Sequence, residues 1–127
     1  MIKRDVKIVG KITEEIANRH NMSDYKNRPI VQSLDFYIHI AKHVKDFKSV
    51  DNYMLALDNI EHVLKEPEFT FYDKTREAIL YYGVTNDNVC YVIKLNLSKD
   101  SCYLASLYPI SKKKLERQRE RSYLCVE

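Results

Sequence analysis

Four β-prone segments follow one another in the second half of the chain, and the short connections between them limit the possible folds. Each segment is rich in β-branched and aromatic residues. The segments are Glu68–Tyr72, Glu77–Thr85, Val89–Leu97 and Ser101–Tyr108. Their connections, Asp73-Lys74, Asn86-Asp87-Asn88 and Ser98-Lys99-Asp100, are too short for the crossover that parallel neighbours need. The second half therefore predicts an antiparallel meander of four strands.

The first half has mainly helical spacing. Residues 6–12 form a short β-like stretch, and Thr13 can cap a small helix that ends near Arg19. Ser33 can cap a helix over residues 33–46, and Ser49 can cap another that Pro67 ends. The apolar residues of this last helix repeat at helical spacing, at Met54, Leu57, Ile60 and Leu64.

A basic helix capped by Ser111 should follow the meander. The predicted fold class is α+β, with N-terminal helices packed on a four-stranded antiparallel β-meander and a C-terminal basic helix. At 127 residues the chain suits a single domain over residues 1–127.

Composition indicates a compact globular protein of the cytoplasm. The chain is 45% hydrophobic and 31% charged, with two glycines and three prolines. Residues 1–6 lack the apolar core of a signal peptide, and no apolar run is long enough for a membrane span. The odd set of cysteines, Cys90, Cys102 and Cys125, fits reduced thiols, of which Cys90 and Cys102 should be buried. We expect a cytoplasmic protein with no membrane partner.

Two histidines, His39 and His43, stand four residues apart in the helix predicted over residues 33–46. Advancing about 100° per residue places them one turn apart on one side. His39 falls opposite the apolar arc and His43 at its boundary beside Phe36, so His43 should be the more buried. The predicted arc comprises Leu34, Phe36, Tyr37, Ile38, Ile40, Ala41, Val44 and Phe47.

The histidine pair admits three interpretations. A zinc site of the HExxH kind needs a glutamate after the first histidine, where this chain has Ile40, although Asp35 or Asp46 could complete another site. In a second interpretation, the histidines make only local ion pairs with Asp35 and Asp46. The third is metal-free RNA cleavage, in which one imidazole takes the proton of a ribose 2′-hydroxyl and a protonated donor passes a proton to the leaving 5′-oxygen. Histidine suits both roles because its unperturbed pKa is about 6.5.

Other polar residues fit a phosphate-binding surface, each with a structural alternative. The segment 111–121 carries six basic and two acidic side chains and could contact phosphates or be a solvated helix. Its predicted nucleic-acid contacts are Lys112, Lys113, Lys114, Arg117 and Arg121. Lys94 could be a cationic partner or an exposed strand lysine, and Arg76 better fits a turn. Seven of ten tyrosines lie from residue 72 onward, and packing in strands explains them better than base stacking.

The order of these predicted elements along the chain is similar to that of a known protein family. The helix with His39-x3-His43 precedes a helix ending at Glu66-Pro67-Glu68, a strand pair, and a late strand with Ser106-x-Tyr108 before the basic segment. Over about residues 6–121 this pattern resembles the phage-associated BECR nucleases, the barnase, EndoU, colicin and RelE-like superfamily. Two positions depart from that pattern: Glu66-Pro67-Glu68 stands where Asn-Pro-Asp is usual, and Ser106 where threonine is common.

The resemblance implies a small metal-independent endoribonuclease that needs no cofactor. His39 and His43 would be the acid/base pair, and Ser106 and Tyr108 would contact the phosphate; strand alternation would put these two on the face of Leu104 and Cys102. The implied partners are RNA, with tRNA as one candidate, and an immunity or antitoxin protein, in a phage, mobile-element or toxin context. The alternative is a non-catalytic module that binds nucleic acid or protein, such as a phage host-defence inhibitor.

Overall fold

The computed structural model describes residues 7–85, 88–98 and 102–124. Its centre is one six-stranded sheet with the strand order β1-β2-β6-β5-β4-β3. The strands are β1 (Lys7–Lys11), β2 (Pro29–Gln32), β3 (Phe69–Asp73), β4 (Ala78–Val84), β5 (Cys90–Leu97) and β6 (Cys102–Pro109). The helices are α1 (Glu14–Arg19), α2 (Leu34–Ile40), α3 (Val50–Asp58), α4 (Ile60–Lys65) and α5 (Lys112–Leu124), with 3₁₀ turns η1 (Ser23–Tyr25) and η2 (Ala41–Asp46).

The predicted meander is present as β3 to β6, which pair antiparallel in sequence order. Two of its predicted connections lie partly outside the described residues, at 86–87 and 99–101. The prediction of a four-stranded sheet was wrong, because β1 and β2 extend it to six. β2 runs parallel to β6, and among the described residues it pairs with β6 at Ile30–Cys102 and Val31–Tyr103. A pairing between segments so distant in the chain leaves no local periodic signal.

A β-bulge in β6 decides which side chains share a face of the sheet. Ser106 pairs with Lys94, whereas Leu104 pairs with Leu95, so Ala105 is the extra residue. Because Lys94 and Leu95 are adjacent on β5, they point to opposite faces, and so do Ser106 and Leu104. Ser106 and Tyr108 still share a face, but the prediction that Leu104 and Cys102 lie on it was wrong.

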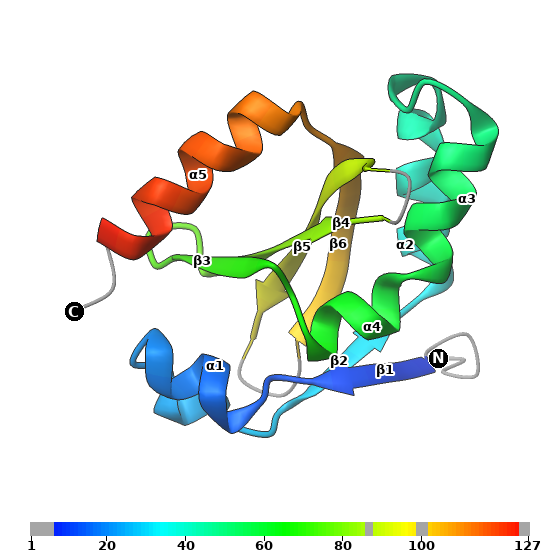
Figure 1. Ribbon diagram of the computed structural model, residues 1–127. Coiled ribbons are helices and arrows are strands. Elements are labelled where there is room, and N and C mark those ends of the chain that lie inside the picture. The colour runs from blue at the N-terminus through cyan, green and yellow to red at the C-terminus, as the bar shows by residue number, and fades with distance from the viewer. Residues whose placement is uncertain (1–6, 86–87, 99–101, 125–127) are drawn as a thin grey trace.

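Helices cover both faces of the sheet. Figure 1 shows α5 on one side and α3 and α4 on the other. The larger core, on the α3–α4 side, includes Ile40, Val63, Ile93 and Leu107. The smaller core joins Leu115 of α5 to sheet residues Phe69, Tyr82, Cys90 and Val92. The N-terminal helices therefore lie mainly on one face, and α5 lies on the face of Ser106 and Tyr108.

Three of the predicted caps are confirmed. The hydroxyl of Thr13 accepts the Ile16 N–H, that of Ser49 accepts the Asn52 N–H, and that of Ser111 accepts the Lys114 N–H. These bonds satisfy N–H groups that a helix start leaves unpaired. Ser33 differs, because its hydroxyl makes no capping bond and its carbonyl accepts the Phe36 N–H instead.

The two predicted central helices are each divided. The helix over 33–46 changes from α to 3₁₀ at Ala41, and the next one breaks at Asn59. The predicted apolar arc of the helix over 33–46 was too broad, because Leu34, Tyr37, Ile38 and Ala41 are exposed. In the next predicted helix, Met54 is also exposed. Because α2 packs beside β6 at the point where β2 has ended, only Phe36 and Ile40 of α2 are buried.

Candidate functional site

Two neighbouring strands carry three of the predicted site residues. Lys94 lies opposite Ser106, and Val92 lies opposite Tyr108, so Lys94, Ser106 and Tyr108 project from the α5 face of the β5–β6 pair. Directly opposed residues of antiparallel strands have Cβ atoms about 4.5–5.5 Å apart. Lys94 is half-buried, and Ser106 is 9% exposed. An ammonium group and a hydroxyl therefore stand side by side on the sheet.

The two histidines reach this region from the side of the sheet. α2 and η2 pack against β6. The ring centroid of His43 lies 6.3 Å from that of Tyr108, and the rings of His39 and His43 are 5.7 Å apart and edge-on. The ring of His43 thus lies next to the rings of both His39 and Tyr108. His43 is half-buried and His39 exposed, which confirms the order of burial predicted from the helical wheel.

Asp46 fixes the orientation of His43. The Nδ1 atom of His43 and the Oδ2 atom of Asp46 are 3.0 Å apart. A carboxylate only accepts hydrogen bonds, so Nδ1 carries the proton and donates a hydrogen bond to Asp46. The second ring nitrogen, Nε2, is then the atom available to a ligand. The sequence suggested Asp46 as an ion-pair partner or a zinc ligand, and in the structure Asp46 is paired with His43.

No group of three or more His, Cys, Asp or Glu side chains within residues 7–85, 88–98 and 102–124 is arranged to hold a metal ion. His39 and His43 are therefore not joined by a third ligand from that part of the chain. The interpretation of the pair as a zinc site receives no geometric support there.

Tyr108 keeps its proton under ordinary conditions. Burial raises the pKa of its phenol above the usual value. The group is therefore a neutral hydrogen-bond donor beside His43. Neutral donors and cations placed around a phosphate stabilise the charge that its oxygens gain in a transition state.

The basic residues predicted to contact nucleic acid lie on α5 and are exposed. Lys114 reaches the region of Tyr108, because both line the same hollow. The guanidinium of Arg121 lies 5.8 Å from the ring centre of Phe71. The exposed predicted residues are Lys112, Lys113, Lys114, Arg117 and Arg121.

Arg119, outside that predicted set, attaches α5 to the sheet. It binds Glu68 at 3.1 Å and Glu116 at 3.5 Å, and it lies over the ring of Phe69. Glu68 is the acid that follows Pro67 in Glu66-Pro67-Glu68, one of the two positions at which the sequence departs from the resembled pattern. In this structure its carboxylate anchors α5.

Several other sequence predictions concern structural residues. Arg76 flanks the β3–β4 turn, where its backbone N–H donates to Asp73, so the turn interpretation fits. Cys90 and Cys102 are buried free thiols, and burial raises the pKa of Cys102 to about 11. A thiol with a raised pKa is a weak nucleophile. Cys125 lies outside the described residues.

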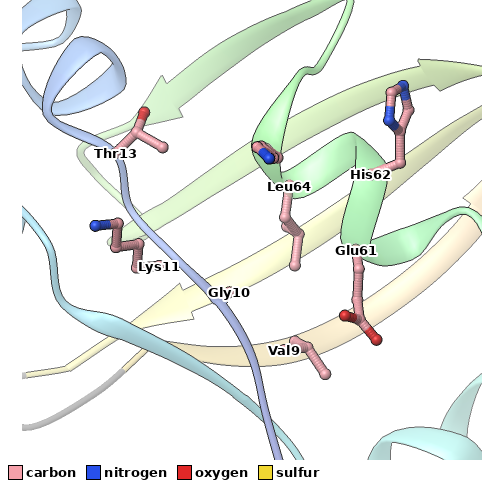
Figure 2. Close-up of a pocket in the computed structure, with 8 residues that line it drawn as sticks. Val9, Gly10, Lys11, Thr13, Glu61, His62 and Leu64 are labelled. Carbon is pink, nitrogen blue, oxygen red and sulfur yellow. The ribbon is translucent and has the colours of Figure 1, made fainter.

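A separate hollow of about 460 Å³ lies between β1 and α4. Figure 2 shows Leu64 extending toward Gly10, while the imidazole of His62 points away from the strand. Leu64 lies 3.6 Å from where a Cβ on Gly10 would be, so the two elements are in ordinary contact. None of the predicted site residues lines this hollow.

The imidazole of His43 lies beside the phenol of Tyr108, which shares a sheet face with the hydroxyl of Ser106 and the ammonium of Lys94. Groups of these kinds can exchange protons with a phosphodiester substrate and stabilise its charge. A nuclease-like site agrees with the comparison to known families. The family PBECR3, described as phage-Barnase-EndoU-ColicinE5/D-RelE like nuclease3, matches residues 7–117. The chain belongs to this family, and its domain is nuclease-like.

Comparisons with curated proteins and with solved structures find no match. Within the described residues, no helix has the length and apolar character needed to cross a membrane.

Proposed function

We propose that this protein is a metal-independent endoribonuclease that cleaves RNA through attack of a ribose 2′-hydroxyl on the neighbouring phosphodiester. The observation that carries the proposal is the contact between His43 and Tyr108, beside Ser106 and Lys94 on the same sheet face. Membership of a nuclease-like family supports a phosphodiester as the substrate.

In the proposed reaction His43 is the base. Its Nε2 atom takes the proton of the 2′-hydroxyl, because Nδ1 is bonded to Asp46. The 2′-oxygen then bonds to phosphorus and the bond from phosphorus to the 5′-oxygen breaks. His39, protonated, supplies the proton that the departing 5′-oxygen takes up. The products are a 2′,3′-cyclic phosphate and a free 5′-hydroxyl.

Groups on the sheet would stabilise the crowded phosphorane in this reaction. Lys94 supplies positive charge, and the hydroxyls of Ser106 and Tyr108 donate hydrogen bonds to phosphate oxygens. The exposed basic residues of α5 would hold the flanking phosphates of RNA, with tRNA as one candidate substrate. An immunity or antitoxin protein would restrain the activity inside a host.

Cleavage of end-labelled RNA in the presence of EDTA tests this function. The wild type should cut, whereas His43→Ala and His39→Ala should each lose about 100-fold or more in rate. His62→Ala is a matched control, since His62 is an exposed histidine on α4. Undiminished cutting by both site variants would exclude the mechanism. RNA binding without any product would favour the non-catalytic module instead.

A further inference from the structure

A small hollow lies between α5 and the sheet, next to the site. Its volume is about 130 Å³. The sheet side supplies the apolar side chains of Leu80 and Val92, and Ile110 closes one end of the same lining. Pockets for drug-sized ligands have volumes of about 300–1,000 Å³. This hollow can therefore take one flat ring system but not a whole nucleotide.

Two tyrosines give the hollow aromatic walls. Tyr82 and Tyr108 both line it. Tyr82 is held in place by stacking on Phe69, with ring centroids 4.1 Å apart and planes 12° from parallel. Aromatic side chains stack favourably on nucleobases, because every base has a π-face. The shape and the walls suit a nucleobase better than a flexible aliphatic ligand.

The helix side presents hydrogen-bond donors. Lys114 and Gln118 of α5 line the hollow. The hydroxyl of Tyr82 donates to Oε1 of Gln118 at 3.4 Å, which orients the amide and leaves the two N–H donors of Nε2 for a ligand. An ammonium group and an amide N–H₂ are both donors, so they favour the edge of a nucleobase that presents acceptor atoms. Uracil and guanine carry keto oxygens at O4 and O6, whereas cytosine and adenine carry amino groups at the corresponding positions, N4 and N6.

The hollow and the candidate active site share a residue. Tyr108 lines the hollow, and its ring lies 6.3 Å from that of His43. A nucleobase in the hollow would place the ribose attached to it near His43, the residue proposed to take the proton of the 2′-hydroxyl.

We propose that this hollow is a nucleobase-binding site that selects a keto base at the cleaved position, with Gln118 as the residue that determines specificity. The inference rests on the proposed ribonuclease function for its biological role. Base binding itself can be measured without any cleavage.

The test is titration of the full chain with the four nucleoside 3′-monophosphates, followed by NMR of the methyl groups of Leu80, Val92 and Ile110. Uridine and guanosine nucleotides should bind at least fivefold more tightly than cytidine and adenosine nucleotides. Gln118→Leu should reduce this preference below twofold, and Glu120→Ala, at an exposed position elsewhere on α5, should leave it unchanged. Equal affinities for all four in the wild type, or an unchanged preference in Gln118→Leu, would overturn the proposal.

A second variant separates specificity from damage to the fold. Gln118→Glu replaces N–H donors with acceptor oxygens and should shift the preference toward cytidine and adenosine nucleotides. A folded Gln118→Glu protein that keeps the wild-type preference would also overturn the proposal. If RNA is never cleaved but the nucleotides are discriminated, the base site stands and the ribonuclease function fails. If RNA is cleaved with no base preference, the ribonuclease function stands and the base site fails.

Discussion

At the scale of single residues, the arrangement around His43 gives its two ring nitrogens different tasks. Nδ1 is bonded to Asp46, and the ring lies beside Tyr108. Because η2 carries both His43 and Asp46, the pair is fixed locally, three residues apart. Asp46 is in this view a positioning residue that holds the imidazole in one tautomer.

Replacing Asp46 tests this role. Asp46→Asn keeps the size of the side chain but can donate to Nδ1, which would place the proton on Nε2. We expect kcat to fall by about 10- to 100-fold with KM changed by less than about twofold, since only an interaction of the transition state is lost. Asp51→Asn, on the exposed first turn of α3, is the control and should behave as the wild type. A rise in KM at constant kcat would instead mean that Asp46 serves substrate binding.

At the scale of elements, β4, β5 and α4 approach closely at Gly83. A Cβ at this position would lie 2.8 Å from side-chain atoms of Val63 and Tyr91. Both neighbours are buried, so neither can move aside freely. This contact joins the sheet to α4, which packs against α3, and α3 in turn packs against η2, the turn that carries His43.

Gly83→Ala should therefore destabilise the fold. We expect a loss of about 1–3 kcal/mol in the free energy of unfolding, the usual cost of overpacking a core. Urea denaturation followed by circular dichroism measures it. Gly10→Ala is the matched control: its added Cβ would meet Leu64 at an ordinary 3.6 Å, so its effect should stay below about 1 kcal/mol. Equal effects of the two substitutions would contradict this account of the packing.

The helix α5 divides its arginines between two tasks. Arg119 is paired with Glu68 and lies over Phe69, whereas Arg117 is exposed. Leu115 of α5 is a buried member of the smaller core. Polar contacts also attach α5 to the sheet, through Arg119 and through Ser122, whose hydroxyl donates to the Thr70 carbonyl. The arginine with packed neighbours should therefore matter for stability.

The two arginines should give opposite results. Arg119→Ala should lower the free energy of unfolding by about 1–2 kcal/mol through lost cation–π contact and packing. Arg117→Ala should leave stability within about 0.5 kcal/mol but weaken RNA binding and reduce the slope of log K against log salt by about 1. Fluorescence anisotropy with labelled RNA at several salt concentrations measures the second effect. A stability loss in Arg117→Ala with an unchanged salt slope would reverse the assignment.

At the scale of the whole molecule, local signals in the sequence predicted the meander but not the complete sheet. Strands β3 to β6 were predictable because each has its own β-prone run and a short connection. β2 starts at Pro29, covers four residues and finds its partner β6 far along the chain. The one-turn spacing of the histidines and the common face of Ser106 and Tyr108 follow from spacing in the sequence. The bulge at Ala105 places that face opposite to Leu104, and because it depends on cross-strand register it has no local signature.

The chain also connects two opposite edges of its sheet. β1 and β3 are the edge strands, yet α1, which follows β1 directly, leads to His20 beside β3. The Nε2 atom of His20 lies 2.6 Å from the hydroxyl of Thr70, and its ring stands edge-on to Tyr72. The carbonyl of Thr70 accepts a hydrogen bond from Ser122 of α5. Thr70 thus links the N-terminal region, the sheet and the C-terminal helix.

This connection should make stability sensitive to acid. Burial, with a smaller contribution from the charge of Arg19, lowers the pKa of His20 from 6.5 to about 4. The folded state therefore binds the proton less readily than the unfolded chain. The contribution of neutral His20 to the free energy of unfolding is fully present above pH 6.5 and is lost as the pH falls from 6.5 toward 4. Because His20 is only partly buried, solvent screening limits the expected contribution to about 1–2 kcal/mol.

His20→Gln, which keeps a hydrogen-bonding side chain but does not titrate, isolates this effect. Urea unfolding at pH 7 and pH 4.5 should show a smaller loss of stability in the variant than in the wild type, by about 1 kcal/mol. His62→Gln serves as the control, since His62 is exposed and points away from β1 (Figure 2). If wild type and His20→Gln lose equal stability between the two pH values, His20 is not the group that couples proton uptake to unfolding. If only His20→Gln resists acid, a single half-buried imidazole controls how firmly the two edges of the sheet are joined.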